Sequence, residues 1–218
     1  MLFENGQKIV FTGDSITDAD RKRPLGEGLW QGVGNGYVRA FDTMINVLYP
    51  DMLFHISNTG WSGNTSRDLL ARFDKDVIDL SPDWVVLMIG ANDVWRHFDE
   101  PGLASQHVHA DEYRENMIAM LDKMQAAGIR PILWTPYIME ANKNDPFRKE
   151  LEAFASIVKE LAAEREILCV DAQAIFDDYM QYRYGAGISW DRIHPSHIGS
   201  MLLARGLLRA IGADRAFI

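Results

Sequence analysis

The stretch Asp83-Trp84-Val85-Val86-Leu87-Met88-Ile89, which ends at Gly90, decides the fold class of this chain. Its residues are almost continuously apolar, whereas a strand with one solvated face alternates between apolar and polar residues. A continuous apolar run is typical of a strand that is covered on both faces in a parallel sheet. The stretch is therefore predicted to be a strand inside an α/β protein.

Further strand and helix signals alternate on either side of this run. Short apolar runs that stop at turn residues predict four more strands, at 8–12, 52–56, 130–134 and 166–170. Helical spacing of apolar residues occurs between them, near 37–48, 66–79, 111–127, 147–163 and 195–211. The alternation predicts one three-layer α/β/α domain over residues 1–218, with a flavodoxin-like, doubly wound, five-stranded parallel sheet.

Four short polar islands lie at turns that this topology brings close together. They are Gly13-Asp14-Ser15-Ile16-Thr17, Trp61-Ser62-Gly63-Asn64-Thr65, Gly90-Ala91-Asn92-Asp93 and Asp191-Arg192-Ile193-His194. The first three follow the first three predicted strands, and open parallel sheets bind ligands beyond the carboxyl ends of their strands. The fourth lies in the last loop, before a helix that Pro195 is expected to open. We therefore expect all four to form one site.

Ser15, His194 and Asp191 have the chemistry of a nucleophile, its base and a carboxylate that orients the base. Asp191 and His194 are three residues apart, so a turn can bring the carboxylate to one ring nitrogen and leave the other for Ser15. Each residue has a plainer explanation, because serine after a strand often caps a helix and Asp–His pairs are common on surfaces. The catalytic interpretation is favoured because all three are expected at the same edge of the sheet.

Three groups are candidate donors to an oxyanion: the backbone N–H groups of Ser15 and Gly63, and the side-chain amide of Asn92. Gly63 has no side chain to keep a substrate away from the backbone, and the Asn92 amide donates without carrying a charge. The alternative for both residues is a tight turn. Asp14 and Asp93 are expected to hold backbone N–H groups rather than to react.

Aromatic residues adjoin the islands. Trp30, in the glycine-rich segment 24–36, is expected to line a pocket for an acyl group or a sugar, together with Trp95 and Trp190, although plain packing explains them equally well. Segment 24–36 lacks the glycine spacing of a nucleotide-binding loop.

No cofactor is expected. The segment His107-Val108-His109 has metal-ligand spacing, but no carboxylate or cysteine completes a pattern there. Acyl transfer by a serine needs neither a metal ion nor an organic cofactor.

The composition excludes several classes of partner. With 22 Lys+Arg against 31 Asp+Glu the formal net charge is -9, which repels nucleic-acid phosphates and anionic membranes. One cysteine, Cys169, excludes an internal disulfide. Neither a signal peptide nor an apolar run long enough to span a bilayer is visible. We therefore expect a cytoplasmic protein without nucleic-acid or membrane partners.

The four islands resemble the sequence blocks of the SGNH hydrolase superfamily, also called the GDSL esterase/lipase family. The namesake residues of that family correspond to Ser15, Gly63, Asn92 and His194 in this sequence. The chain departs from the GDSL motif at Ile16, which stands where the family has leucine. The resemblance extends over essentially the whole chain and implies the family's fold, with Asp191 completing a catalytic triad.

A narrower resemblance concerns intracellular acetyl esterases of this family, which the segments 13–18, 63–65, 92–96 and 190–195 resemble. It implies removal of acetyl groups from xylo-oligosaccharides and assembly into homo-oligomers. The apolar tail Ala216-Phe217-Ile218 is consistent with docking, either on a second copy or on the chain's own domain.

These observations lead to the hypothesis of a serine esterase for short acyl esters, with acetyl groups on a sugar as the favoured substrate. One alternative keeps the triad but acts on longer acyl chains, lysophospholipids or thioesters. Another is a carbohydrate-binding protein without turnover, which is expected to lack a member of the triad. None is missing from this sequence.

Overall fold

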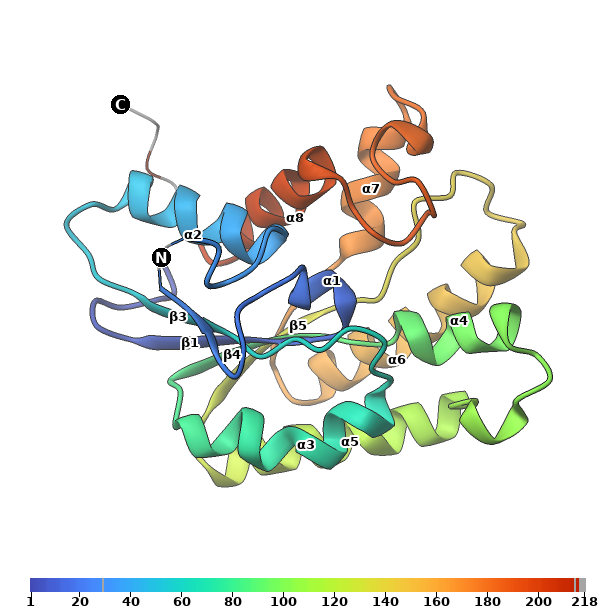
Figure 1. Cartoon of the computed structure of the whole chain (residues 1–218), viewed down its shortest axis with the longest axis horizontal. Coiled ribbons are helices and arrows are strands. Elements are labelled where there is room, and N and C mark those ends of the chain that lie inside the picture. The colour runs from blue at the N-terminus through green and yellow to red at the C-terminus, as the bar shows by residue number, and fades with distance from the viewer. Residues whose placement is uncertain (29, 214, 216–218) are drawn as a thin grey trace.

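The computed structural model describes residues 1–28, 30–213 and 215, and within them a six-stranded sheet lies between two layers of helices (Figure 1). The strands are β1 (Lys8–Gly13), β2 (Gly26–Glu27), β3 (His55–Asn58), β4 (Trp84–Met88), β5 (Arg130–Trp134) and β6 (Leu168–Val170). The helices are α1 (Ser15–Asp18), α2 (Tyr37–Leu48), α3 (Ser66–Asp76), α4 (Ala91–Asp99), α5 (Ala110–Ala126), α6 (Pro146–Glu164), α7 (Ala172–Met180) and α8 (His197–Ala210). Short 3-10 helices are η1 (Ile78–Leu80), η2 (Ala104–Gln106) and η3 (Gly185–Gly187). The tail 216–218, for which docking was expected, lies outside the described residues.

The strand order is β2-β3-β1-β4-β5-β6. From β3 to β6 all neighbouring strands are parallel, so the predicted five-stranded, doubly wound sheet is confirmed. The edge strand β2 comes from the glycine-rich segment and pairs antiparallel with β3. A side chain at Gly26 would meet the carbonyl oxygen of Asn58, because a Cβ there would lie 2.8 Å from it.

Helices cover both faces of the sheet. In Figure 1, α2, α7 and α8 lie on one face, and α3, α5 and α6 lie on the other. All five residues of β4 are buried, which explains why its sequence is apolar without alternation. The core is thus continuous through the sheet, and the polar islands are at its edge.

Local capping chemistry sets where several helices begin. Thr65 and Asp68 form a reciprocal capping box at the start of α3. Asp145 caps α6, whose first residue is Pro146. Gly90 precedes α4 with φ of +127°, a backbone conformation that favours glycine. Three of the four islands therefore lead directly into helices: α1 begins after Asp14, α3 after Thr65 and α4 after Gly90.

Three sequence expectations need correction. The last helix begins at His197 and not at Pro195, because Pro195 is held in an extended bridge with Ser189 and Ser196 is the N-cap. The island Gly90-Ala91-Asn92-Asp93, expected to lie at a turn, instead opens helix α4. The first turn of α4 buries the polar residues Asn92 and Asp93. Its buried face therefore lacks the apolar pattern by which a surface helix is predicted from sequence. Helix α7 was not expected either.

Candidate active site

Ser15 stands at the sharp turn between β1 and α1, at the carboxyl edge of the sheet (Figure 1). Asp14 caps this turn, and its Oδ1 accepts from the Ile16 N–H at 3.0 Å. Gly13 makes the turn possible, because its φ is +155° and a Cβ there would lie 2.0 Å from the Met88 carbonyl oxygen. Because β4 lies this close to residue 13, only glycine fits there, and the chain can turn into the helix that begins at Ser15.

Ser15 and His194 are joined by a hydrogen bond. The Ser15 Oγ lies 2.7 Å from the His194 Nε2, although 179 positions separate the two residues. The other ring nitrogen, Nδ1, lies 2.5 Å from the Asp191 Oδ2. The three-residue spacing of Asp191 and His194 thus brings the carboxylate to the imidazole, as expected from the sequence.

The Asp191 carboxylate is held in place by further donors. Its Oδ1 accepts from the backbone N–H groups of Ile193 and His194 and from the Ser189 hydroxyl. Burial alone would raise the pKa of Asp191, but the hydrogen bonds from His194 and from these backbone groups hold the pKa below its usual value of 3.8. A carboxylate charged at neutral pH keeps a proton on the His194 Nδ1, which leaves Nε2 to accept from Ser15.

Hydrogen bonds connect the turn that contains Gly63 to the Ser15 turn and to α4. The Trp61 N–H donates to the Gly13 carbonyl at 3.0 Å, and the Asn92 Nδ2 donates to the Asn64 carbonyl at 3.0 Å. Gly63 itself is exposed with φ of +83°. Across the described residues, the backbone N–H groups of Ser15 and Gly63 have no hydrogen-bond acceptor, so both are free to donate to a ligand.

Two buried carboxyl groups lie beneath these donors. The pKa of Asp14 is raised to about 7, mainly by burial and in smaller part by the neighbouring Asp93, despite the hydrogen bond from Ile16. Burial also raises the pKa of Asp93 to about 6, against hydrogen bonds from the N–H and hydroxyl of Ser66. Both carboxyl groups accept from backbone N–H groups, as expected.

The three tryptophans differ in their relation to this site. Trp95, in α4, is half-buried, and its ring centroid lies 5.8 Å from that of His194. It also lines a hollow of about 240 Å³ that includes Asp191. Trp30 and Trp190 are exposed, by 83% and 87%, and make no ring contact with another residue of the described chain. The structure thus brings Trp95 to the triad and leaves the other two on the surface.

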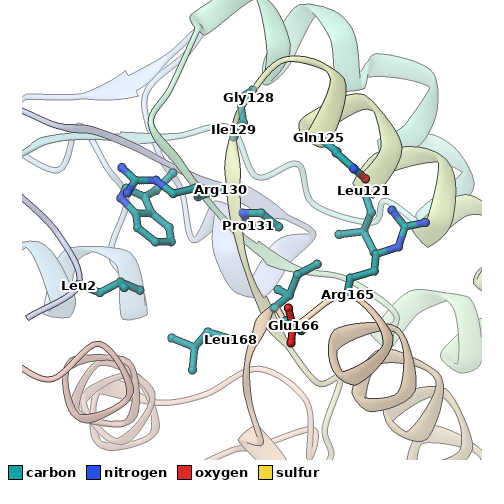
Figure 2. A pocket seen from close by; sticks show the side chains of 12 residues that line it. Leu2, Leu121, Gln125, Gly128, Ile129, Arg130, Pro131, Arg165, Glu166 and Leu168 are labelled. Carbon is teal, nitrogen blue, oxygen red and sulfur yellow. The ribbon is translucent and has the colours of Figure 1, made fainter.

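Other hollows lie at different distances from the triad. One of about 440 Å³ adjoins Gly63 and includes Arg96. Another, of about 630 Å³, lies at the opposite edge of the sheet, where β4, β5 and β6 begin (Figure 2). Trp84, Arg130 and Leu168, the first residues of these strands, line it. It is therefore separate from the site around Ser15.

The described residues contain no group of three or more His, Cys, Asp or Glu side chains arranged to hold a metal ion. His97 joins His107 and His109 in one cluster, with ring centroids 4.8 to 6.2 Å apart.

Among the helices of the described residues, none has the length and apolar character needed to cross a membrane.

Two arginines contact residues of the candidate site in ways that the sequence did not predict. Arg72 of α3 donates to the Gly13 carbonyl, and Arg96 of α4 donates to the Asn92 Oδ1. Asn92 and Arg96 are four residues apart, a spacing that brings two side chains together on a helix such as α4. No comparable signal exists for Arg72, because its contacts span distant segments.

Comparison with known proteins gives consistent matches. Residues 11–202 match the model of the GDSL-like lipase/acylhydrolase family. An acetylxylan esterase of Geobacillus stearothermophilus is 43% identical over 214 residues, which are 98% of each chain. The crystal structure of that esterase, Axe2, has a TM-score of 0.95 and covers 97% of each chain.

Two further findings come from solved structures. LAE5, a hydrolase from the metagenome of Lake Arreo in Spain, is 39% identical with a TM-score of 0.96, over 99% of this chain and 100% of that one. Structures are also known of catalytic mutants of Axe2 named S15A, D191A and H194A. The sequence, the fold and the geometry of Ser15, Asp191 and His194 agree, and this chain belongs to the GDSL-like lipase/acylhydrolase family.

Proposed function

We propose that this protein is a serine esterase that removes acetyl groups from xylo-oligosaccharides or closely similar sugars. As a homologue of an acetylxylan esterase over nearly its full length, it is a carboxylic ester hydrolase. The observation that supports the mechanism most directly is the 2.7 Å hydrogen bond between the Ser15 Oγ and the His194 Nε2. The replacements that make Axe2 a catalytic mutant are at residues of the same type and number as Ser15, Asp191 and His194.

In the first half of the reaction, Ser15 attacks the carbonyl carbon of the acetyl ester. His194 takes the hydroxyl proton on Nε2, and the Asp191 carboxylate stabilises the imidazolium that forms. The tetrahedral intermediate collapses when His194 gives this proton to the sugar oxygen, which leaves as an alcohol. The product is an acetyl group bonded to the Ser15 Oγ.

The second half repeats the same proton transfers with water. His194 removes a proton from water, the resulting hydroxide attacks the acetyl carbonyl, and Ser15 leaves with the proton returned by His194. In both halves the negative oxygen accepts hydrogen bonds from the Ser15 N–H, the Gly63 N–H and the Asn92 amide. The loss of one such donor is expected to raise the barrier by about 3 kcal/mol.

The sugar ring is proposed to lie on the His194 side of the nucleophile, because His194 must reach the oxygen that leaves. Trp95 supports this placement, since its ring lies beside that of His194. Aromatic faces suit the apolar faces of sugars. Trp30 and Trp190 are proposed as outer pocket residues, because their exposed rings are available to a longer oligosaccharide.

The test is a panel of acetylated xylo-oligosaccharides together with p-nitrophenyl esters of increasing acyl length. We expect release of acetate from the sugars and a preference for acetyl over longer chains. Ser15→Ala is expected to lower kcat by roughly 10⁴- to 10⁶-fold without unfolding the protein. A preference for long acyl chains would instead indicate a lipase or thioesterase, and retention of activity in Ser15→Ala would overturn the serine mechanism.

Two features of the cellular context are proposed on the same basis. We propose a cytoplasmic location and assembly into homo-oligomers, as the resemblance to intracellular acetyl esterases implies. The exposed aromatic side chains of Tyr182 and Tyr184 support assembly, because they offer apolar surface to a second copy. Size-exclusion chromatography with light scattering tests the assembly, and a monomeric mass would contradict it.

A further inference from the structure

The amide of Asn92 is held at both of its ends. Its Nδ2 donates to the Asn64 carbonyl at 3.0 Å, next to Gly63, and its Oδ1 accepts from the Arg96 Nη2 at 3.2 Å. Asn92 is 3% exposed, so little water competes for either contact. Asn92 and Arg96 are four residues apart in α4, which places them on the same side of the helix.

Arg96 decides which end of the amide points toward the Gly63 turn. An arginine side chain can only donate hydrogen bonds, so the amide oxygen must face it and the NH₂ group must face away. If the amide rotated by half a turn, Oδ1 would oppose the Asn64 carbonyl oxygen and the negative oxygen of the intermediate. Arg96 thus selects the rotamer in which Asn92 can act as a donor.

The guanidinium charge also acts on the amide electronically. A hydrogen bond from a cation draws electron density toward the amide oxygen, which makes the N–H groups stronger donors. The second hydrogen on Nδ2, which Asn64 does not use, is available to an oxyanion. Arg96 is itself fixed by ion pairs with Asp99 at 2.6 Å and Glu100 at 3.8 Å.

We propose that Arg96 is a positioning residue of the esterase reaction, which orients and polarises the Asn92 amide so that it donates to the oxyanion. The inference rests on the proposed function, because it assigns Asn92 a role in that reaction. Arg96 does not touch the substrate in this account, and its effect passes through Asn92 alone. Acylation and deacylation both form an oxyanion, so both steps depend on it.

The experiment is a double-mutant cycle on the full-length protein with p-nitrophenyl acetate. Arg96→Met is expected to lower kcat by about 10-fold with KM changed by less than about 2-fold, because both chemical steps slow together. Asn92→Ala is expected to lower kcat by about 10²- to 10³-fold. In the Asn92→Ala background, adding Arg96→Met is expected to change kcat by less than about 2-fold.

Two further variants sharpen the test. Arg67→Met removes a cation from the same hollow near Gly63, but Arg67 pairs with Glu112 and does not contact Asn92, so kcat is expected to stay at the wild-type value. Arg96→Lys keeps a positive donor and is expected to lose less kcat than Arg96→Met. Should Arg96→Met be too unstable to measure, Arg96→Lys with and without Asn92→Ala provides the same cycle.

Two kinds of result would overturn the inference. One is a loss of kcat on Arg96→Met that is equally large in the wild-type and Asn92→Ala backgrounds, since Arg96 would then act on the reaction without the Asn92 amide. The other is an Arg96→Met variant with wild-type kcat beside a strongly impaired Asn92→Ala. Failure of the proposed function appears differently, as a wild-type protein without esterase activity or an active Ser15→Ala variant.

Discussion

The guanidinium of Arg72 donates to the carbonyl oxygen of Gly13 at 3.0 Å, across 59 positions of the chain. Its other nitrogens donate to the Asn64 Oδ1 at 2.6 Å and to the Thr59 carbonyl at 2.8 Å. One partly buried side chain therefore connects the turn before Ser15 with both ends of the Gly63 turn. The relative position of the nucleophile and the Gly63 N–H depends on this fork of hydrogen bonds.

We expect Arg72→Lys to lower kcat/KM for acetyl esters by about 10- to 100-fold, because misplacement by about 1 Å is costly in an active site. Lysine keeps the charge, but a single ammonium group cannot span three acceptors in the way a guanidinium does. Steady-state kinetics with thermal melting as a stability control measures the effect. Wild-type kcat/KM in Arg72→Lys would show that the two turns keep their spacing without this side chain.

The second prediction concerns Gly63. It distinguishes the effect of the Gly63 backbone conformation on stability from the effect of the Gly63 N–H on catalysis. Gly63→Ala places a side chain at φ of +83°, which costs about 1 kcal/mol, although a Cβ would meet no atom within 4 Å. Movement of the N–H is expected to lower kcat by about 10-fold or more.

The matched control for Gly63 is Gly128, which has φ of +70° and equally open space but lies at the opposite edge of the sheet. Gly128→Ala is expected to lose a similar free energy of unfolding and to keep wild-type kcat. Equal losses of kcat in the two variants would assign the effect to general destabilisation instead of the oxyanion contact.

The third prediction concerns Asp191. Asp191→Asn removes the charge behind His194 and allows the ring to place its proton on Nε2, where it cannot accept from Ser15. We expect kcat to fall by roughly 10⁴-fold at neutral pH while the fold is retained. Circular dichroism checks the fold. A variant within about 10-fold of wild-type kcat would mean that the Asp191–His194 contact does not set the tautomer.

The fourth prediction concerns stability and pH. Burial raises the pKa of Asp14 from 3.8 in an exposed setting to about 7 in the fold. The unfolded chain therefore loses this proton at lower pH than the folded chain, and the free energy of unfolding falls as pH rises from 3.8 to about 7. An asparagine at position 14 has no proton to lose in this range. The decrease in the free energy of unfolding between these pH values is therefore expected to be smaller in Asp14→Asn, by up to about 4 kcal/mol.

Urea denaturation at about pH 4 and about pH 8 measures this effect. The stability of Asp14→Asn relative to the wild type should increase between the two values. A stability difference that is identical at both pH values would contradict a raised pKa at Asp14.

Much of the fold and of the candidate triad can be predicted from the sequence, because the relevant signals are local. The apolar run in β4 predicts a strand that is buried on both faces. The three-residue spacing of Asp191 and His194 predicts a turn that brings these two side chains together. The position of Ser15 at a strand end then follows from topology. These inferences need no knowledge of side-chain packing.

The remaining features depend on contacts between distant segments. The strand β2 has two residues and forms because Gly26 fits against Asn58, which no local pattern reveals. Helix α4 is obscured because it buries Asn92 and Asp93, polar residues whose burial is explained by the site and not by hydropathy. The roles of Arg72 and Arg96 follow from the same long-range geometry.

The separation of Ser15 and His194 has a consequence for biosynthesis. A ribosome synthesises Ser15 before His194, and 179 positions separate the two residues. Nascent chains that lack the last loop hold a serine hydroxyl with no imidazole beside it. A chain that stops anywhere between Ser15 and His194 is therefore expected to lack esterase activity.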